Sequence, residues 1–280
     1  MRWRTGRRST NIEDRRGRPA RVGALKGGIG TIVIALVLGY FLGVDPGVLL
    51  QLTQGFAPVE TGEPYRPTAE EQEQADFVSV VLADTEDTWH AIFREAGLTY
   101  AEPGLVLFSG SVRSACGMAS AALGPFYCPT DRKIYIDLDF FSDLKHRHGA
   151  PGDFAQAYVI AHEVGHHVQQ LLGTSERVHS ARQGLDPGDA NALSVKLELQ
   201  ADCFAGVWGN HADRSRQVLE AGDVEEALNA ATAIGDDRLQ QEAQGYVVPE
   251  SFTHGTSAQR VQWFRQGMSR GEASACNTFE

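Results

Sequence analysis

The sequence predicts an α+β fold, which is a mostly helical domain with a small β-sheet, preceded by one transmembrane helix. Several long segments carry apolar residues at helical spacing, and two short segments have the apolar pattern typical of strands. One uncharged stretch near the N-terminus is long enough to span a bilayer. With 280 residues and 42% hydrophobic content, the chain can form one good-sized packed core.

The N-terminal region is predicted to insert into a membrane. Residues 1–26 hold nine Arg and Lys and two acidic residues, a net charge of +7, which leaves −18 for the rest of a chain whose total is −11. Residues 27–44 carry no charge and would cover about 27 Å as a helix. Because basic residues favour the cytoplasmic side, we predict a cytoplasmic tail at 1–26, a single-pass anchor at 27–44 and an extracytoplasmic domain in the periplasm or at the cell exterior. A cleaved signal peptide is the alternative, although no A-x-A-type site follows.

A linker and a long helix are predicted next. Residues 45–66 contain three prolines and are predicted to connect the anchor to a domain at 67–280. Thr68 and Glu71 form a capping box, and the apolar stripe that follows ends near Gly97.

Two predicted strands, residues 105–109 and 133–140, come before the remaining helices. The helices are predicted at 154–172, 192–208, 223–234 and 257–268, with a polar connector at 173–191. A small sheet of this kind offers an edge strand to which an extended peptide could add by backbone hydrogen bonds. The alternative is a sheet that only covers the helices.

The cysteines favour a location outside the cytoplasm. All four, Cys116, Cys128, Cys203 and Cys276, follow the predicted anchor, and an even number is typical of disulfides in such a domain. Of three possible pairings we prefer Cys116 with Cys128 and Cys203 with Cys276, where the longer bridge would contribute about 4 kcal/mol through loop entropy. Zinc ligation by the cysteines is the alternative, but the chain has no C-x-x-C pair.

The segment His162-Glu163-Val164-Gly165-His166 is an H-E-x-x-H motif inside a predicted helix. Histidines four apart on a helix differ by about 40° in azimuth, so both imidazoles can bind the same ion, with Glu163 beside them as a base. Apolar residues at helical spacing around the motif provide the rigid, packed helix that zinc ligation needs. The alternative is a pair of ordinary histidines on a buried helix.

A third protein ligand is needed, because a catalytic zinc site has three, with the fourth position left for water. The predicted helix at 192–208 provides Glu198 as this ligand, and Asp202, on the same face, can accept the free ring N–H of a ligating His. Burying two carboxylates in an apolar helix is costly unless a cation and hydrogen bonds compensate. Such a site suits peptide hydrolysis, with Glu163 as the general base that takes the proton of a zinc-activated water.

The two motifs together resemble the gluzincin arrangement of thermolysin and of the membrane-bound HtpX and CAAX prenyl protease group. Residues 252–260, Phe-Thr-His-Gly-Thr-Ser-Ala-Gln-Arg, resemble the Thr-His-Pro segment of that group with an Arg six residues after the His, but Gly255 stands where the group has Pro. The resemblance implies a second catalytic residue, His254, which would donate a hydrogen bond to the developing oxyanion. A surface-turn histidine is the alternative.

The chain is similar almost end to end to the putative neutral zinc metallopeptidase family, the YpfJ-like proteins of bacteria. The matching segments are Met1–Trp3, Glu13–Gly17, Gly124–Pro129, Ala157–Gln169, Glu198–Cys203, Gly235–Asp237 and Phe252–Gly255. This similarity implies a zincin-like metallopeptidase domain that binds Zn²⁺ at the site described above, and it leaves the substrate open.

The other histidines are not expected to bind the ion. His167 follows the ligand His166 and is rotated about 100° from it on a regular helix, so we expect it to pack or to hydrogen-bond nearby. Four more lie in polar segments and are predicted to be ordinary surface residues: His146, His148, His179 and His211.

These features predict a membrane-anchored zinc endopeptidase that acts on protein or peptide substrates in the cell envelope. One alternative is a catalytically weak, zinc-stabilised scaffold or binding module, which the intact Glu163 disfavours. Another is a zinc hydrolase of a different amide, such as a peptidoglycan cross-link. A nucleic-acid partner is not expected, because the chain has no basic patch beyond residue 26.

Overall fold

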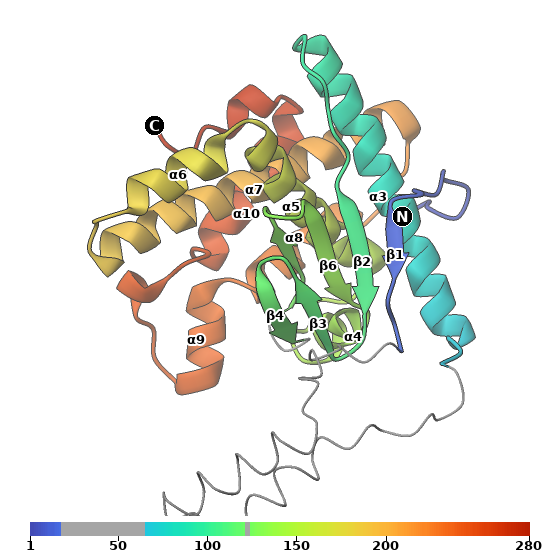
Figure 1. Ribbon diagram of the computed structural model, residues 1–280, viewed down its shortest axis with the longest axis horizontal. Coiled ribbons are helices and arrows are strands. Elements are labelled where there is room, and N and C mark those ends of the chain that lie inside the picture. The colour runs from blue at the N-terminus through green and yellow to red at the C-terminus, as the bar shows by residue number, and fades with distance from the viewer. Residues whose placement is uncertain (18–64, 121–123) are drawn as a thin grey trace, which may run out of the picture. The chain divides into compact units, whose positions relative to one another are not determined.

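A long helix, α3 (Ala69–Glu95), begins where the sequence predicts it (Figure 1). The Thr68 hydroxyl accepts from the backbone N–H of Glu71, and the Glu71 carboxylate accepts from the backbone N–H of Thr68, which completes the capping box. This computed structural model describes residues 1–17, 65–120 and 124–280. The predicted anchor at 27–44 and nearly all of the predicted linker lie outside them, and within the described ranges no helix is long and apolar enough to cross a membrane.

The main sheet has four strands in the order β1-β2-β6-β5. β1 (Ile12–Asp14), β2 (Gly104–Phe108) and β6 (Lys133–Asp137) are parallel, and β5 (Phe126–Cys128) lies antiparallel to β6 at the edge. The predicted strand at 133–140 is shorter than expected because helix α4 (Asp139–His146) follows directly. A separate hairpin pairs β3 (Ser111–Ser114) with β4 (Gly117–Ser120).

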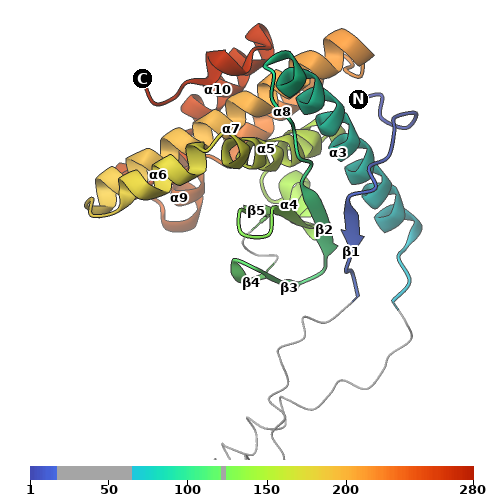
Figure 2. The ribbon, with the colours of Figure 1, turned by 45° about the horizontal axis from the view of Figure 1, so that its top comes forward.

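Six helices follow α4 in the described part of the chain: α5 (Asp153–Leu171), α6 (Thr174–Arg182), α7 (Pro187–Arg216), α8 (Asp223–Ala233), α9 (Asp236–Gln244) and α10 (Ser257–Arg270). Short 3-10 turns lie at η2 (Pro249–Ser251) and η3 (Ala273–Cys276). α5 lies between the sheet and α7 (Figure 2). The predicted fold class is therefore confirmed in its main feature, a mostly helical domain with a small sheet.

The predicted polar connector at 173–191 is wrong, because it contains α6 and the start of α7. α7 begins at Pro187, where the Asp186 carboxylate caps the backbone N–H of Asp189 at 3.0 Å and proline occupies the first helical position. The extra turns lengthen α7 to 30 residues.

Helices α5 and α7 approach closely at Gly165, inside the H-E-x-x-H motif. A Cβ atom added there would lie 3.0 Å from both Cα and the carbonyl oxygen of Ala201. The missing side chain lets the two helix backbones pack together. This packing sets the distance between the motif histidines and the carboxylates of α7.

The N-terminal residues differ from the prediction of a separate basic tail. Met1–Arg16 belongs to the same compact unit as Pro67–Glu280, and β1 pairs in parallel with β2. Trp3 is 9% exposed and packs edge-on against Phe77 of α3, with ring centroids 5.3 Å apart. The first 16 residues are therefore part of the folded domain.

Ion pairs with α3 explain why the basic N-terminal residues belong to the folded domain. Arg4 bonds to Glu73, Arg8 lies 3.1 Å from Asp76, and Arg7 lies 2.8 Å from the buried Glu86, all on α3. Composition showed the positive charges but not their acidic partners on a helix far along the chain. These arginines pair with acidic residues of α3 and hold the N-terminal segment against it.

Both preferred disulfides are confirmed. Cys116 bonds to Cys128, which ties the β3–β4 hairpin to β5. Cys203 bonds to Cys276, which ties the C-terminal segment to α7. No free cysteine is present in the described ranges.

Candidate metal centre

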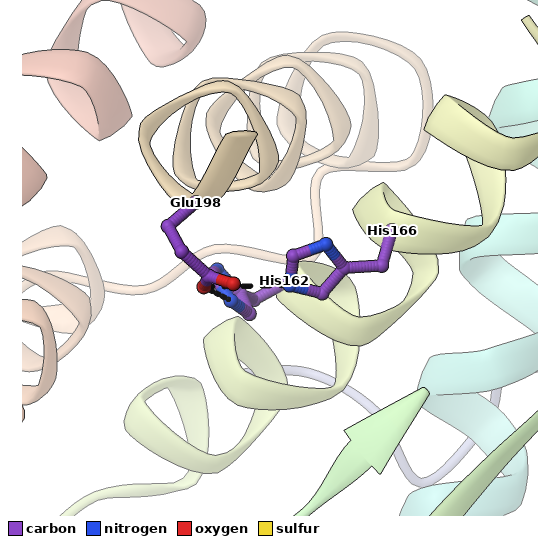
Figure 3. Close-up of side chains that lie close together, drawn as sticks. All are labelled: His162, His166 and Glu198. Carbon is purple, nitrogen blue, oxygen red and sulfur yellow. Dashed lines mark hydrogen bonds and ion pairs between the residues drawn. The ribbon is translucent and has the colours of Figure 1, made fainter. Parts of the chain in front are cut away.

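Three side chains from α5 and α7 converge on one point (Figure 3). His162 and His166 project from consecutive turns of α5 toward Glu198 of α7. The Oε2 atom of Glu198 lies 3.1 Å from Nε2 of His162 and 3.4 Å from Nε2 of His166. The three ligand atoms lie within 4.8 Å of one another. Two imidazole nitrogens and a carboxylate oxygen form a donor set that suits zinc.

Hydrogen bonds behind the histidines orient both rings. Nδ1 of His162 lies 2.8 Å from Oδ1 of Asp202, and Nδ1 of His166 lies 2.9 Å from Oε1 of Gln169. Because these oxygens accept, each Nδ1 carries the proton in a neutral ring, and each Nε2 is left with its lone pair facing Glu198. This arrangement is typical of metal-binding histidines.

Asp202 is fully buried and is compensated by Arg260 of α10. The guanidinium binds the carboxylate through Nε and Nη2, both at 2.9 Å, and the Tyr158 hydroxyl donates to Oδ1 at 2.5 Å. Arg260 also donates to the carbonyl of Ile234 at 3.1 Å. A buried ion pair with these additional bonds holds Asp202 in its charged form behind His162.

The electrostatics of the site favour a positive charge between the ligands. Burial opposes protonation of His162, but Asp202 and Glu198 outweigh it and raise its pKa to about 10. Burial also opposes protonation of His166, but the negative charge of Glu198 outweighs it and raises the pKa of His166. Although burial opposes its charge, the neighbouring histidines hold the pKa of Glu198 well below its usual range. The carboxylates thus provide the negative field that a bound cation requires.

A cavity of about 680 Å³ opens onto this cluster, a size within the range of small-molecule and peptide-binding sites. Glu163 lines it beside the two ligand histidines and is 7% exposed. Burial raises the pKa of Glu163, which makes its carboxylate a stronger base than one in water.

His254 lines the same cavity, and its side chain is about half exposed. Asp236, at the start of α9, lies 3.2 Å from Nδ1 of His254. The same carboxylate accepts backbone N–H bonds from Thr253 at 2.8 Å, His254 at 2.6 Å and Gly255 at 3.1 Å. The bond that Nδ1 of His254 donates to Asp236 raises the pKa of His254, and no described residue is hydrogen-bonded to Nε2.

Comparison with known proteins agrees with this geometry. Residues 1–279 match the family described as "Putative neutral zinc metallopeptidase". The chain belongs to this family. The uncharacterized protein YpfJ of Escherichia coli (strain K12) is 52% identical over 289 aligned positions, which cover 100% of this chain and 99% of that protein. Uncharacterized proteins of Mycobacterium bovis and Mycobacterium tuberculosis (strain H37Rv) are 41% identical over 254 positions, 85% of this chain and 84% of theirs. No solved structure gives a significant match.

In this member of the zinc metallopeptidase family, the structure brings together every residue that the sequence assigned to the site. His162, Glu163, His166, Glu198 and His254 all line one cavity, and Asp202 lies directly behind His162. Their catalytic and metal-binding roles remain predictions.

Sequence reasoning missed three residues of the site, Gln169, Asp236 and the role of Arg260. Gln169 lies three residues after His166 on the same helix, a spacing that could have pointed to it. Arg260 and Asp236 lie in two segments that the resemblances had singled out, 252–260 and Gly235–Asp237. Their roles were not predicted, because both reach the site from helices that are distant in sequence from their partners.

Two histidines outside the ligand cluster, His167 and His148, can be compared with their predicted environments. His167 is fully buried and does not join the ligand cluster, as expected. Burial lowers its pKa to about 4, and Nε2 lies 2.6 Å from the carbonyl oxygen of Ala101. His148 differs from the prediction of an ordinary surface residue, because it lines the cavity after the C-terminal end of α4.

Proposed function

We propose that this protein is a zinc-dependent metalloendopeptidase that hydrolyses peptide bonds in proteins of the cell envelope. The observation that carries the proposal is the convergence of His162, His166 and Glu198 on one point of a cavity that Glu163 also lines. Membership of a zinc metallopeptidase family supports the same chemistry.

Each residue has a distinct role in this proposal. A zinc ion held by the three ligands supplies Lewis acidity for the scissile carbonyl and for water activation. Glu163 takes the proton of the attacking water and passes it to the leaving amine. His254, oriented by Asp236 through Nδ1, donates from Nε2 to the oxygen that gains negative charge.

The sheet edge supports a peptide as the substrate class. β5 is the edge strand of the main sheet, and Phe126 and Tyr127 line the cavity of the metal cluster. An extended peptide can pair with such an edge through its backbone. This arrangement favours cleavage within unfolded or extended segments.

The two disulfides support a location outside the cytoplasm. Residues 1–16 and 67–280 form one folded unit, so both lie on the same side of any membrane. A single crossing at 27–44 with a cytoplasmic N-terminus would separate them. We therefore place both parts on the extracytoplasmic side. In cells, Thr5→Cys and Arg265→Cys should both react with a membrane-impermeant maleimide, whereas protection of Thr5→Cys alone would restore the single-pass arrangement.

Metal analysis of the purified protein tests the ligand set. We expect about one zinc per chain in the wild type, and loss of zinc in His162→Ala and Glu198→Ala. His167→Ala, which changes the adjacent histidine, should retain the metal. A wild-type protein that binds no zinc would refute the proposal.

Complementation of a deletion strain distinguishes the peptidase from the scaffold alternative. Glu163→Gln removes the base but keeps the side-chain shape. If Glu163→Gln restores the phenotype of a deletion strain as well as the wild type does, the protein acts as a zinc-stabilised binding module. We expect Glu163→Gln to fail in this assay.

A further inference from the structure

The edge strand β5 forms one wall of the cavity. Residues Gly124–Tyr127 and Pro129 line it, together with the metal cluster. β5 pairs with β6 on one side, and no strand in the described part of the chain pairs with its other side. A strand of three residues held by one neighbour needs further support to keep its position.

That support comes from the motif helix. The Tyr127 hydroxyl lies 2.9 Å from Nδ1 of His167, and Nε2 of His167 lies 2.6 Å from the carbonyl oxygen of Ala101. A carbonyl can only accept, so Nε2 carries the proton and Nδ1 accepts from the tyrosine. Both ring nitrogens are used, and the ring is fully buried.

A single helix thus holds two parts of the site. His166 faces the metal cluster, and His167, about 100° further round α5, faces the cavity wall. The disulfide between Cys116 and Cys128 also ties β5 to the β3–β4 hairpin. The position of the wall relative to the metal ligands is therefore set by adjacent residues of one rigid element.

We propose that His167 is a positioning residue that fixes β5, through Tyr127, as the strand on which an extended peptide substrate docks. The peptide pairs with the free edge of β5, and the scissile bond is thereby placed over His162, His166 and Glu198. This inference rests on the proposed peptidase function, but it concerns a residue that touches neither the metal nor the substrate.

The test uses Tyr127→Phe, which removes one hydroxyl and leaves the ring, together with His167→Asn and the double variant. For a ten-residue quenched-fluorescence peptide that the wild type cleaves, we expect KM to rise about tenfold with kcat changed less than about twofold, from the loss of one buried hydrogen bond that holds the wall. The double variant should be no worse than His167→Asn, because the two side chains act as one unit. Zinc content should be unchanged in all three.

Tyr135→Phe is the matched control. Tyr135 lies on the neighbouring strand β6, is buried, and donates its hydroxyl to Asp131 at 2.7 Å, but it does not line the cavity. Loss of this bond should lower the melting temperature without changing KM. Equal changes in KM for Tyr127→Phe and Tyr135→Phe would show a general structural effect and would overturn the positioning role.

Hydrogen exchange provides a readout that does not depend on peptidase activity. In Tyr127→Phe and His167→Asn, the amides of Phe126–Cys128 should exchange about tenfold faster than in the wild type, with exchange in α7 unchanged. Unchanged exchange in β5 would refute the positioning role even in an active peptidase. Faster exchange in a protein that cleaves no peptide would retain the role and refute the peptidase proposal alone.

Discussion

Gln169 is fully buried, and its amide oxygen lies 2.9 Å from Nδ1 of His166. Its amide nitrogen donates to the carbonyl of Leu197 at 2.6 Å, which fixes the side chain between α5 and α7. Gln169→Met should weaken zinc binding about tenfold, because the ring of His166 loses the acceptor that orients it. The measurement is competition with a chelator of known affinity.

Gln200→Met is the control for Gln169→Met. Gln200 is also buried on the interface of these helices and contacts Gln169 at 3.2 Å, but it touches neither ligand histidine. Its replacement should leave zinc affinity within about twofold of the wild type. Equal losses in the two variants would assign the effect to packing.

His254 gives the site a predicted pH dependence. The hydrogen bond that Nδ1 of His254 donates to Asp236 raises the pKa of His254, so the imidazole stays protonated to a higher pH than an ordinary histidine. Asp236→Asn removes the negative charge and should lower that pKa. The protonated donor is then lost earlier as the pH rises, and the alkaline limb of kcat/KM should move to lower pH. An unchanged alkaline limb would remove His254 from the catalytic step.

At this scale, local geometry made part of the site predictable. His162, Glu163 and His166 share one helix, as do Glu198 and Asp202, so the spacing of each set fixes a common face. Gln169 shares α5 with His166, but the other partners, Arg260 and Asp236, come from other helices, and their contacts depend on tertiary packing that no spacing rule describes.

Close packing of α5 against α7 determines the geometry of the metal centre at the scale of elements. Gly165→Ala places a methyl group 3.0 Å from the backbone of Ala201, and overpacking of this kind costs about 1–3 kcal/mol. The better helix propensity of Ala offsets about 1 kcal/mol of this cost. We expect a net loss of unfolding free energy and weaker zinc binding, measured by urea denaturation with and without zinc.

Gly188→Ala is the control that separates the effect of helix propensity from the effect of overpacking. Gly188 lies in the first turn of α7, where an added Cβ would meet only the Asp186 carboxylate at 3.4 Å. This variant should be as stable as the wild type or slightly more stable. If Gly165→Ala behaves in the same way, helix contact at Gly165 does not limit the site.

Elements with strong periodic patterns were predicted, and elements without them were not. The apolar residues at helical spacing in α3 and α5 and the apolar alternation in β6 match the structure, because residues that pack on the core recur at the period of the element. α6 is mostly polar and β5 has three residues, so neither carries a periodic signal.

The N-terminal residues are the clearest difference between prediction and structure for the whole molecule. The carboxylate of Glu86 is 1% exposed and accepts from Ser9 at 2.6 Å, Asn11 at 2.9 Å and Arg7 at 2.8 Å. A protein made of residues 67–280 alone should lose at least about 3 kcal/mol of stability, because it lacks the buried Trp3, the pairing of β1 with β2 and the three partners of Glu86.

Addition of a synthetic peptide of residues 1–16 tests this directly. The peptide should raise the melting temperature of the 67–280 protein in a concentration-dependent way. A peptide with Ser9→Ala and Asn11→Ala, which lacks two of the three partners of Glu86, should raise it much less. Equal stability of the 67–280 protein with and without the peptide would show that the first 16 residues are not part of the fold.

Glu163 provides the most direct test of zinc-dependent peptide hydrolysis. Purified wild type and Glu163→Gln are loaded with zinc, and cleavage of a mixed-sequence quenched-fluorescence peptide library is measured, with metal content determined on the same samples. We expect equal zinc in both proteins, cleavage by the wild type, and a rate for Glu163→Gln lower by a factor of at least about 100, the contribution of a general base. Cleavage at the same rate by Glu163→Gln, or no cleavage by a zinc-loaded wild type, would contradict the proposed function.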